Sequence, residues 1–91
     1  MAKVIVKLRV MPESPEIDLN NVIDEIKSKI EAFSASLEAS EKKPIAFGLN
    51  ALELVLLVDE EKGSTEQLEE DIKKIAGVQS VEVIDVRRAI G

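Results

Sequence analysis

The stretch KKPIAFGLNALELVLLV, residues 42–58, contains the most apolar run of the chain. Glycine and asparagine tolerate the positive φ angles that a tight reversal requires, and both occur just before this run. We therefore expect a β-hairpin in which residues 44–48 and 51–59 form two strands joined at Leu49 and Asn50. One face of the second strand is wholly apolar and the other is mixed, as in an inner strand that is partly covered on its second side.

The residues before this hairpin predict a strand, a helix and a connection. Apolar residues alternate with basic ones in AKVIVKLRVM, residues 2–11, which is the period of a half-buried strand. Two prolines in PESPE interrupt the strand, and residues 19–33 then carry apolar side chains at helical spacing. Residues 34–44, SASLEASEKKP, show neither period, so we interpret them as a connection that ends at Pro44.

A second helix is expected after the hairpin. Ser64 can cap its N-terminus with Gln67 three residues later, and Gly77 suits its C-terminal cap. Its apolar stripe consists of Leu68, Ile72 and Ile75.

The final stretch VQSVEVIDVRR, residues 78–88, is rich in β-branched residues and predicts a strand. Val83 followed by Ile84 breaks the strict alternation of this strand. Such a break indicates either a β-bulge or burial on both faces.

The predicted order β-α-β-β-α-β is the split βαβ arrangement, whose right-handed crossovers place both helices on one side of the sheet. We expect an α+β fold: a ferredoxin-like βαββαβ sandwich with a four-stranded antiparallel sheet and two helices on one face. Because 91 residues with 45% hydrophobic content leave room for one compact core, residues 1–91 are expected to form a single domain. The other sheet face would carry Lys7, Arg9, Glu53, Val55 and Leu57.

Composition excludes several classes of function. The chain has no cysteine and no histidine, which rules out disulfide scaffolds, thiolate catalysis and imidazole general-base chemistry. Its 18 acidic and 12 basic residues give a net charge of −6, so we expect neither direct nucleic-acid binding nor binding to an anionic membrane. The sequence shows no secretory signal pattern and no apolar run of membrane-spanning length, and a cytoplasmic location is expected.

Three known kinds of binding site require residues that this sequence lacks at the necessary positions. EKGST, residues 61–65, lacks the earlier glycine of a phosphate-binding loop. The acidic run at residues 59–61 lacks the alternating oxygen ligands of a calcium loop, so we predict a solvated turn and no metal site. A sheet that binds RNA needs exposed aromatic residues on its central strands, and neither phenylalanine of this chain stands there.

Two features remain as candidate functional sites. Phe47 and Gly48 stand at the mouth of the predicted hairpin, where the phenylalanine either fills the core or serves a contact, and the glycine serves the turn. Arg87 and Arg88, in the C-terminal DVRRAIG, reverse the local charge of an acidic protein, and they belong either to a solvated end or to a site.

The chain resembles the guanine-nucleotide exchange domain family of elongation factor 1-beta, in its archaeal form. The resemblance rests on the Pro-Ile-x-aromatic-Gly run at residues 44–48, on VDEEKGSTEQLEE at residues 58–70 and on VQS at residues 78–80, and it covers essentially the whole chain. It implies the same ferredoxin-like fold. It also implies that this protein promotes exchange of GDP for GTP on elongation factor 1-alpha, the GTPase that carries aminoacyl-tRNA to the ribosome.

The resemblance also assigns roles to the two candidate features. The aromatic residue of the aromatic-glycine pair contacts the GTPase in eukaryotic relatives, and Phe47 followed by Gly48 occupies that position here. The same relatives use a lysine near the C-terminus that reaches the magnesium and phosphate region of the GTPase. Alignment from VQS places Arg88 at that position, and Arg87 is its possible substitute. A guanidinium is planar and broader than an ammonium, so the geometry of the contact would differ.

An exchange factor of this family is not an enzyme, and we expect no catalytic residue, no cofactor and no small-molecule substrate. It acts by linkage, because it binds the nucleotide-free GTPase more tightly than the nucleotide-bound form. The alternative function is a ferredoxin-like module for small-molecule sensing or assembly, since domains of this topology also bind metabolites between subunits.

Overall fold

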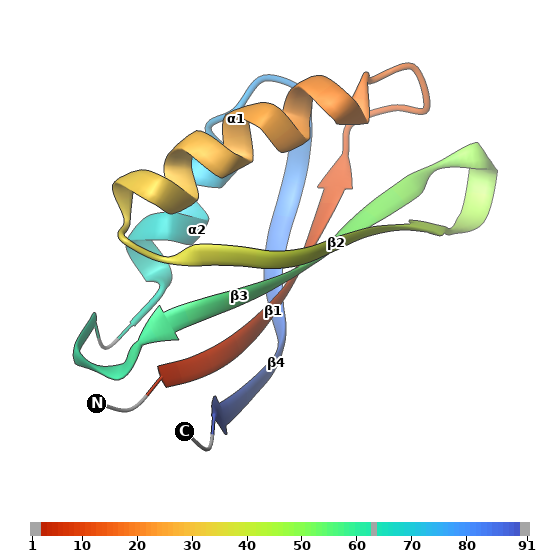
Figure 1. The fold of residues 1–91 in the computed structure, drawn as a ribbon. Helices are drawn as coiled ribbons and strands as arrows, with labels where there is room; N and C mark the ends of the chain where they lie inside the picture. Colours follow the sequence, from red (N-terminus) through yellow and green to blue (C-terminus); the bar gives the residue numbers. More distant parts are fainter. Residues whose placement is uncertain (1–2, 63, 90–91) are drawn as a thin grey trace.

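The computed structural model describes residues 3–62 and 64–89. Figure 1 shows the predicted order of elements, with a four-stranded antiparallel sheet and two helices. The elements are β1 (Lys3–Pro12), α1 (Leu19–Ala32), β2 (Ser36–Pro44), β3 (Asn50–Asp59), α2 (Glu66–Lys73) and β4 (Val78–Ala89). The strand order is β2-β3-β1-β4, so that β1 and β3 are central and β2 and β4 are edge strands. The α+β ferredoxin-like prediction is confirmed.

The hydrophobic core lies between the sheet and the helices. Alternate residues of β1, such as Val6 and Leu8, pair with Leu56 and Leu54 of β3 and are buried with them. Both helices bury their apolar stripes against these strand residues, with Val22, Ile26, Ile30, Leu68 and Ile72 in the same cluster. The two helices therefore cover one face of the sheet, as the period-2 and helical spacings predict.

The opposite face of the sheet, which we call the open face, carries the residues expected there. Lys7 of β1 pairs with Val55 of β3, and Arg9 pairs with Glu53. Since successive side chains of a strand alternate between faces, these residues point away from the face that carries the buried row of Leu8, Leu54 and their neighbours.

Residues 34–44 were expected to form a connection, and this expectation was wrong, because Ser36–Pro44 forms strand β2. Most side chains of β2 are exposed, so the strand has no alternation of apolar and polar residues to reveal it. Its main chain pairs with β3, from Ser36 opposite Leu57 to Pro44 opposite Asn50, with an irregularity between Leu37 and Ala39. The ladder of β3, rather than burial of its own side chains, holds this edge strand in place.

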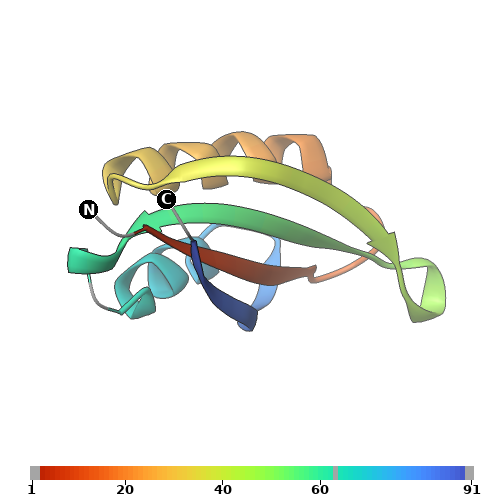
Figure 2. The same ribbon diagram turned by 60° about the horizontal axis from the view of Figure 1, so that its bottom comes forward.

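The hairpin is present, but residues 44–48 do not form its first strand. Ala46–Gly48 forms a short 3₁₀ turn, and the chain reverses between Pro44 and Asn50, which face each other across β2 and β3. Within this loop the Ile45 amide donates to the Leu49 carbonyl at 2.8 Å. Asn50 therefore belongs to β3 and not to the turn. Figure 2 shows the loop extending beyond α1 at one end of the molecule.

Helix α2 is shorter than predicted at both ends. Thr65, not Ser64, is its N-cap residue, while the Ser64 hydroxyl accepts a hydrogen bond from the Glu66 amide at 3.0 Å. The helix ends at Lys73, and Gly77 lies in the following turn at a φ of 93° rather than at the cap. A Cβ at Gly77 would lie 3.0 Å from the Ile17 side chain. Gly77 therefore allows both the turn and its close contact with the segment before α1.

Strand β4 contains a bulge, which is one of the two alternatives that the sequence left open. Lys7 pairs with Asp85 and the next residue, Leu8, pairs with Val83, which leaves Ile84 as the extra residue. Val83 is partly exposed, so the break in alternation reflects a bulge and not burial on both faces. The extra residue reverses which side chains of β4 point to each face of the sheet. It thereby decides which face carries each of the two arginine residues that follow.

No helix in the described ranges, 3–62 and 64–89, is long and apolar enough to cross a membrane.

Candidate functional site

Phe47 lies at the tip of the loop between β2 and β3. Its side chain is 94% exposed, and its backbone φ is 61°, in the left-handed region that residues with a Cβ seldom adopt. Phe47 therefore does not fill the core, which excludes the first of its two interpretations from the sequence. Such a backbone costs about 1–2 kcal/mol, and strained residues of this kind cluster at binding sites.

Two neighbours shape this tip. Gly48 also has a positive φ, 75°, and nothing lies within 4 Å of a Cβ built there, so the backbone angle rather than lack of space favours glycine. Ile45, two residues before Phe47, is itself exposed and extends the apolar surface of the loop. Ile45 was not among the candidate residues expected from the sequence, although its place in the Pro-Ile-x-aromatic-Gly run was a signal.

Arg87 and Arg88 lie near the end of β4, on the edge of the sheet. Arg87 pairs with Ile5 of β1 and Arg88 pairs with Val4. Val4 packs against the core under the helices, whereas Ile5 lies on the open face. Because neighbours in a strand alternate between faces, Arg87 belongs to the open face and Arg88 to the helix side. Ile90 and Gly91, the last residues of DVRRAIG, lie outside the described residues.

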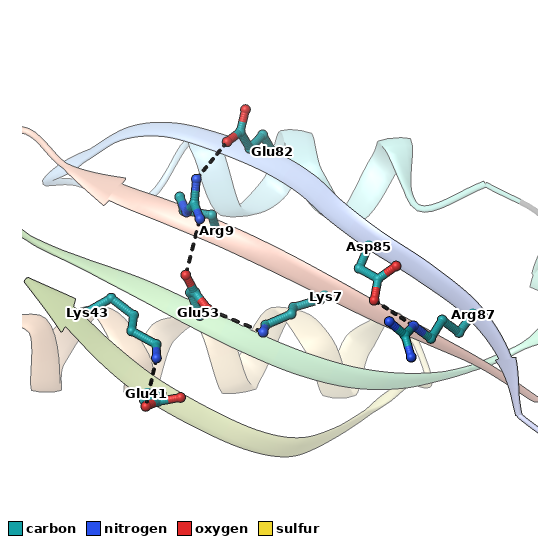
Figure 3. A network of polar contacts seen from close by, with 8 residues as sticks. All are labelled: Lys7, Arg9, Glu41, Lys43, Glu53, Glu82, Asp85 and Arg87. Atoms are coloured by element: carbon teal, nitrogen blue, oxygen red, sulfur yellow. Dashed lines mark hydrogen bonds and ion pairs between the residues drawn. The ribbon is translucent and has the colours of Figure 1, made fainter. Parts of the chain in front are cut away.

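Each arginine has a carboxylate partner on its own side of the sheet. The Arg87 Nε donates to Asp85 Oδ2 at 2.9 Å, two residues back along β4 (Figure 3). The Arg88 Nη2 donates to Glu60 Oε1, in the short turn Glu60–Lys62 that follows β3. The spacing of Asp85 and Arg87 could have predicted the first pair. Nothing in the sequence links Glu60 to Arg88, because 28 residues separate them.

The structure does not bring Phe47 and the arginine residues together. Asn50 begins β3 at the loop end, and Val58, eight residues later, lies across β1 from Arg88. At about 3.4 Å per residue, the two positions are about 27 Å apart along the strand. Figure 1 shows the light-green loop and the C-terminus at opposite ends of the sheet, and the molecule is 41 Å long. The candidate residues thus lie in two separate places on the surface.

A network of ion pairs covers the middle of the open face between these ends (Figure 3). Glu53 is only 8% exposed, although α1 and α2 both cover the other face, because Lys7 and Arg9 lie over its carboxylate at 3.4 and 3.2 Å. Arg9 also pairs with Glu82 of β4 at 3.5 Å. Burial raises the pKa of Glu53, but the hydrogen bonds and charges of Arg9 and Lys7 outweigh this effect and hold its pKa below the ordinary value.

Glu60 and Glu61 of the acidic run at residues 59–61 lie in a turn, as expected, whereas Asp59 is the last residue of β3. The Glu61 amide donates to Asp59 Oδ1 at 3.0 Å, and Asp59 lies 3.8 Å from Lys3 Nζ. No group of three or more carboxylates suited to a metal ion occurs within residues 3–62 and 64–89.

A hollow of about 530 Å³ lies apart from both candidate sites. It is formed between the start of α1 and the turn before β4, and its lining includes Asp18, Asp24 and Glu25. Neither Phe47 nor the arginine residues line it, so the candidate residues do not belong to this hollow.

Known proteins resemble this chain in sequence and in fold. Residues 5–89 match the family model described as EF-1 guanine nucleotide exchange domain. Elongation factor 1-beta of Methanosphaera stadtmanae is 49% identical over 88 residues, which cover 97% of this chain and 98% of the relative. Elongation factor 1-beta of Hyperthermus butylicus is 44% identical over 89 residues, 97% of this chain and 96% of the relative.

Among solved structures, the ACT domain from GTP pyrophosphokinase of Chlorobium tepidum has a TM-score of 0.63 at 18% identity, covering 90% of this chain and 99% of that domain. At such low identity the likeness concerns the fold alone. The match over residues 5–89 and the identity of nearly half of all positions to the Methanosphaera stadtmanae relative are far more specific. The chain belongs to the EF-1 guanine nucleotide exchange domain family.

Proposed function

We propose that this protein promotes the exchange of GDP for GTP on elongation factor 1-alpha in the cytoplasm, with residues 1–91 acting as one exchange domain. The observation that carries the proposal is the exposed Phe47, held in a strained backbone at the tip of a loop, in a chain of this family. A large apolar side chain in such a position serves no packing within its own fold, and it suits a pocket on a partner.

The exchange needs no covalent step. A factor that binds the nucleotide-free GTPase more tightly than the GDP-bound form lowers the affinity for GDP by the same ratio, because the coupling between the two ligands is reciprocal. The binding energy comes from contacts made only with the nucleotide-free form.

Arg88 is the residue of this chain suited to the magnesium and phosphate region of the partner. Its side chain is 71% exposed at the end of the sheet, and a permanent positive charge placed beside the phosphates competes with the Mg²⁺ of the GTPase. Arg87 lies on the open face, so a surface that meets Arg88 from the helix side does not meet Arg87 in the same way.

The distance between Phe47 and Arg88 has a mechanistic consequence. Phe47 and Arg88 lie at opposite ends of the sheet, and the part of β3 from Asn50 to Val58 alone spans about 27 Å, so the two residues would touch separate parts of a GTPase at a spacing that the sheet fixes. We infer that Phe47 holds one surface of the partner while Arg88 acts at the nucleotide. Closure of the partner around GDP would then conflict with one of the two contacts.

The test is release of a fluorescent GDP analogue from elongation factor 1-alpha of the same organism, with this protein added at increasing concentration. Acceleration that rises with concentration, and that falls in both Phe47→Ala and Arg88→Ala, is expected. No acceleration at excess protein would contradict the proposed function. Loss of the folded state in either variant would identify that residue as structural instead, so circular dichroism accompanies each measurement.

A further inference from the structure

The hydrogen-bond partner of Arg88 is Glu60, which lies beyond the neighbouring strand β1. Arg88 stands on edge strand β4, while Glu60 follows β3, and β1 lies between the two strands. Neighbouring strands lie about 4.8 Å apart, so the pair spans about 10 Å of sheet. The Arg88 side chain therefore runs inward across the end of β1, over Val4, rather than outward from the edge.

The turn that carries Glu60 is itself fixed. Asp59 accepts a hydrogen bond from the Glu61 amide at 3.0 Å and lies 3.8 Å from Lys3 Nζ. The residues on either side of Glu60 are thus joined by a hydrogen bond, which fixes the backbone that carries the Glu60 carboxylate.

The contact leaves most of the guanidinium available. Glu60 accepts from one nitrogen, Nη2, and a guanidinium has five N–H donors. With 71% of its side chain exposed, Arg88 is oriented by Glu60 without being enclosed. A second acceptor with the planar oxygens of a carboxylate or phosphate can bind the remaining donors while the first contact persists.

Arg87 provides an internal comparison. Its partner Asp85 stands on the same strand, two residues away, and so does not draw the side chain across the sheet. The pair lies on the open face, opposite to that of Arg88 and Glu60. Of the two arginine residues, Arg88 is the one whose orientation depends on a different segment of the chain.

We propose that Glu60 is a positioning residue, which holds Arg88 across the end of β1 so that its free guanidinium donors face the phosphates of a nucleotide bound to the partner. The inference rests on the proposed function. An arginine that is already ordered loses less side-chain freedom when the partner docks, so the exchange-competent complex forms more readily. Glu60 acts only through Arg88 and does not itself touch the nucleotide.

The test measures GDP release with Glu60→Ala, Arg88→Ala and the double variant. Glu60→Ala is expected to lower the apparent second-order rate constant of exchange about 3- to 10-fold, the effect of leaving one long side chain unordered before binding. In the Arg88→Ala background the same change is expected to have no effect, since Glu60 acts through Arg88. Glu60→Gln keeps the acceptor oxygen and should recover part of the loss.

Two matched controls come from the chain. Glu61→Ala removes the next carboxylate of the same turn, and Asp85→Ala releases Arg87 on the other face; neither should change the rate of exchange. Nitrogen-15 relaxation of the arginine Nε–H groups, measured on this protein alone, supplies a readout that needs no GTPase. The Arg88 signal should become more mobile in Glu60→Ala and stay unchanged in Glu61→Ala.

The outcomes separate this inference from the proposed function. If the unaltered protein does not accelerate release, the proposed function fails and this inference fails with it, even where relaxation shows Arg88 to be ordered. If the unaltered protein accelerates release but Glu60→Ala is equally fast or faster, only the positioning role is overturned; a faster variant would mean that Glu60 masks Arg88. A mobile Arg88 in the unaltered protein would overturn it as well.

Discussion

Arg87 and Arg88 are consecutive residues of β4, yet they lie on opposite faces of the sheet, where Asp85 holds the first and Glu60 holds the second. The alternation of side chains along a strand makes this separation unavoidable. The bulge at Ile84 decides which arginine faces which way, because without the extra residue both would change sides.

The first prediction follows from this separation. Arg88→Ala should slow exchange about 10- to 100-fold, since a hydrogen bond to a charged group is worth about 1.5–3 kcal/mol. Arg87→Ala, the matched control from the opposite face, should stay within about twofold, the scale of a surface substitution. The measurement is the rate of GDP release with each variant. A larger decrease of this rate in Arg87→Ala than in Arg88→Ala would assign the nucleotide-facing contact to the open face.

Replacement of Phe47 by asparagine should leave stability equal or higher but should slow exchange. Phe47→Asn keeps a residue that tolerates φ near 61°, so we expect the free energy of unfolding to stay equal or to rise by up to about 1 kcal/mol. Removal of the exposed ring should slow exchange about 30-fold, the effect of losing an interface residue worth about 2 kcal/mol. Urea denaturation and GDP release test the two halves. A destabilised variant would show that the ring packs on its own chain.

Gly48 and Gly77, which both have a positive φ, should differ in their tolerance of alanine. At Gly77 a Cβ meets Ile17 at 3.0 Å, so Gly77→Ala should cost about 1–3 kcal/mol of stability, from the strained backbone and the contact together. At Gly48 the space is open and only the backbone angle opposes the change, which should cost about 1 kcal/mol. Thermal unfolding of both variants gives the comparison. Equal losses would mean that the Ile17 contact relaxes freely.

Glu53 should make stability depend on pH in acid. The pKa of Glu53 in the folded state lies below its ordinary value of 4.5, so near that pH the unfolded chain binds more protons and stability rises with pH. The contribution is therefore fully present above pH 4.5 and is lost as pH falls through the lower, folded pKa.

Glu53→Gln should accordingly lower the melting temperature at pH 7, and its difference from the unaltered protein should shrink below pH 4.5. Glu31→Gln, a change at an exposed residue of α1 away from this network, is the control and should show little difference at either pH. A melting difference for Glu53→Gln that stays constant from pH 7 to pH 3 would contradict the ionic role of Glu53.

The parts of this fold that bury an apolar row were predictable from the sequence. The alternation in β1 and β3 and the helical spacing in α1 each reflect a face that must leave water, and the order of these elements then leads to the ferredoxin-like arrangement. The break at Val83 and Ile84 indicated either a bulge or burial on both faces, and the register of β4 shows that it is a bulge. Phe47 was identifiable as a candidate contact residue from its place beside Gly48, in a chain that belongs to the exchange-domain family.

Strand β2 and the partner of Arg88 were decided by the tertiary structure alone. β2 buries little, so its strand conformation comes from main-chain hydrogen bonds that β3 supplies, and a side-chain pattern contains no trace of them. Glu60 meets Arg88 only because β1 sets β3 and β4 two strand spacings apart and aligns their ends. Periodicity in a sequence records which side chains leave water, whereas contacts between exposed side chains depend on where the folded backbone places them.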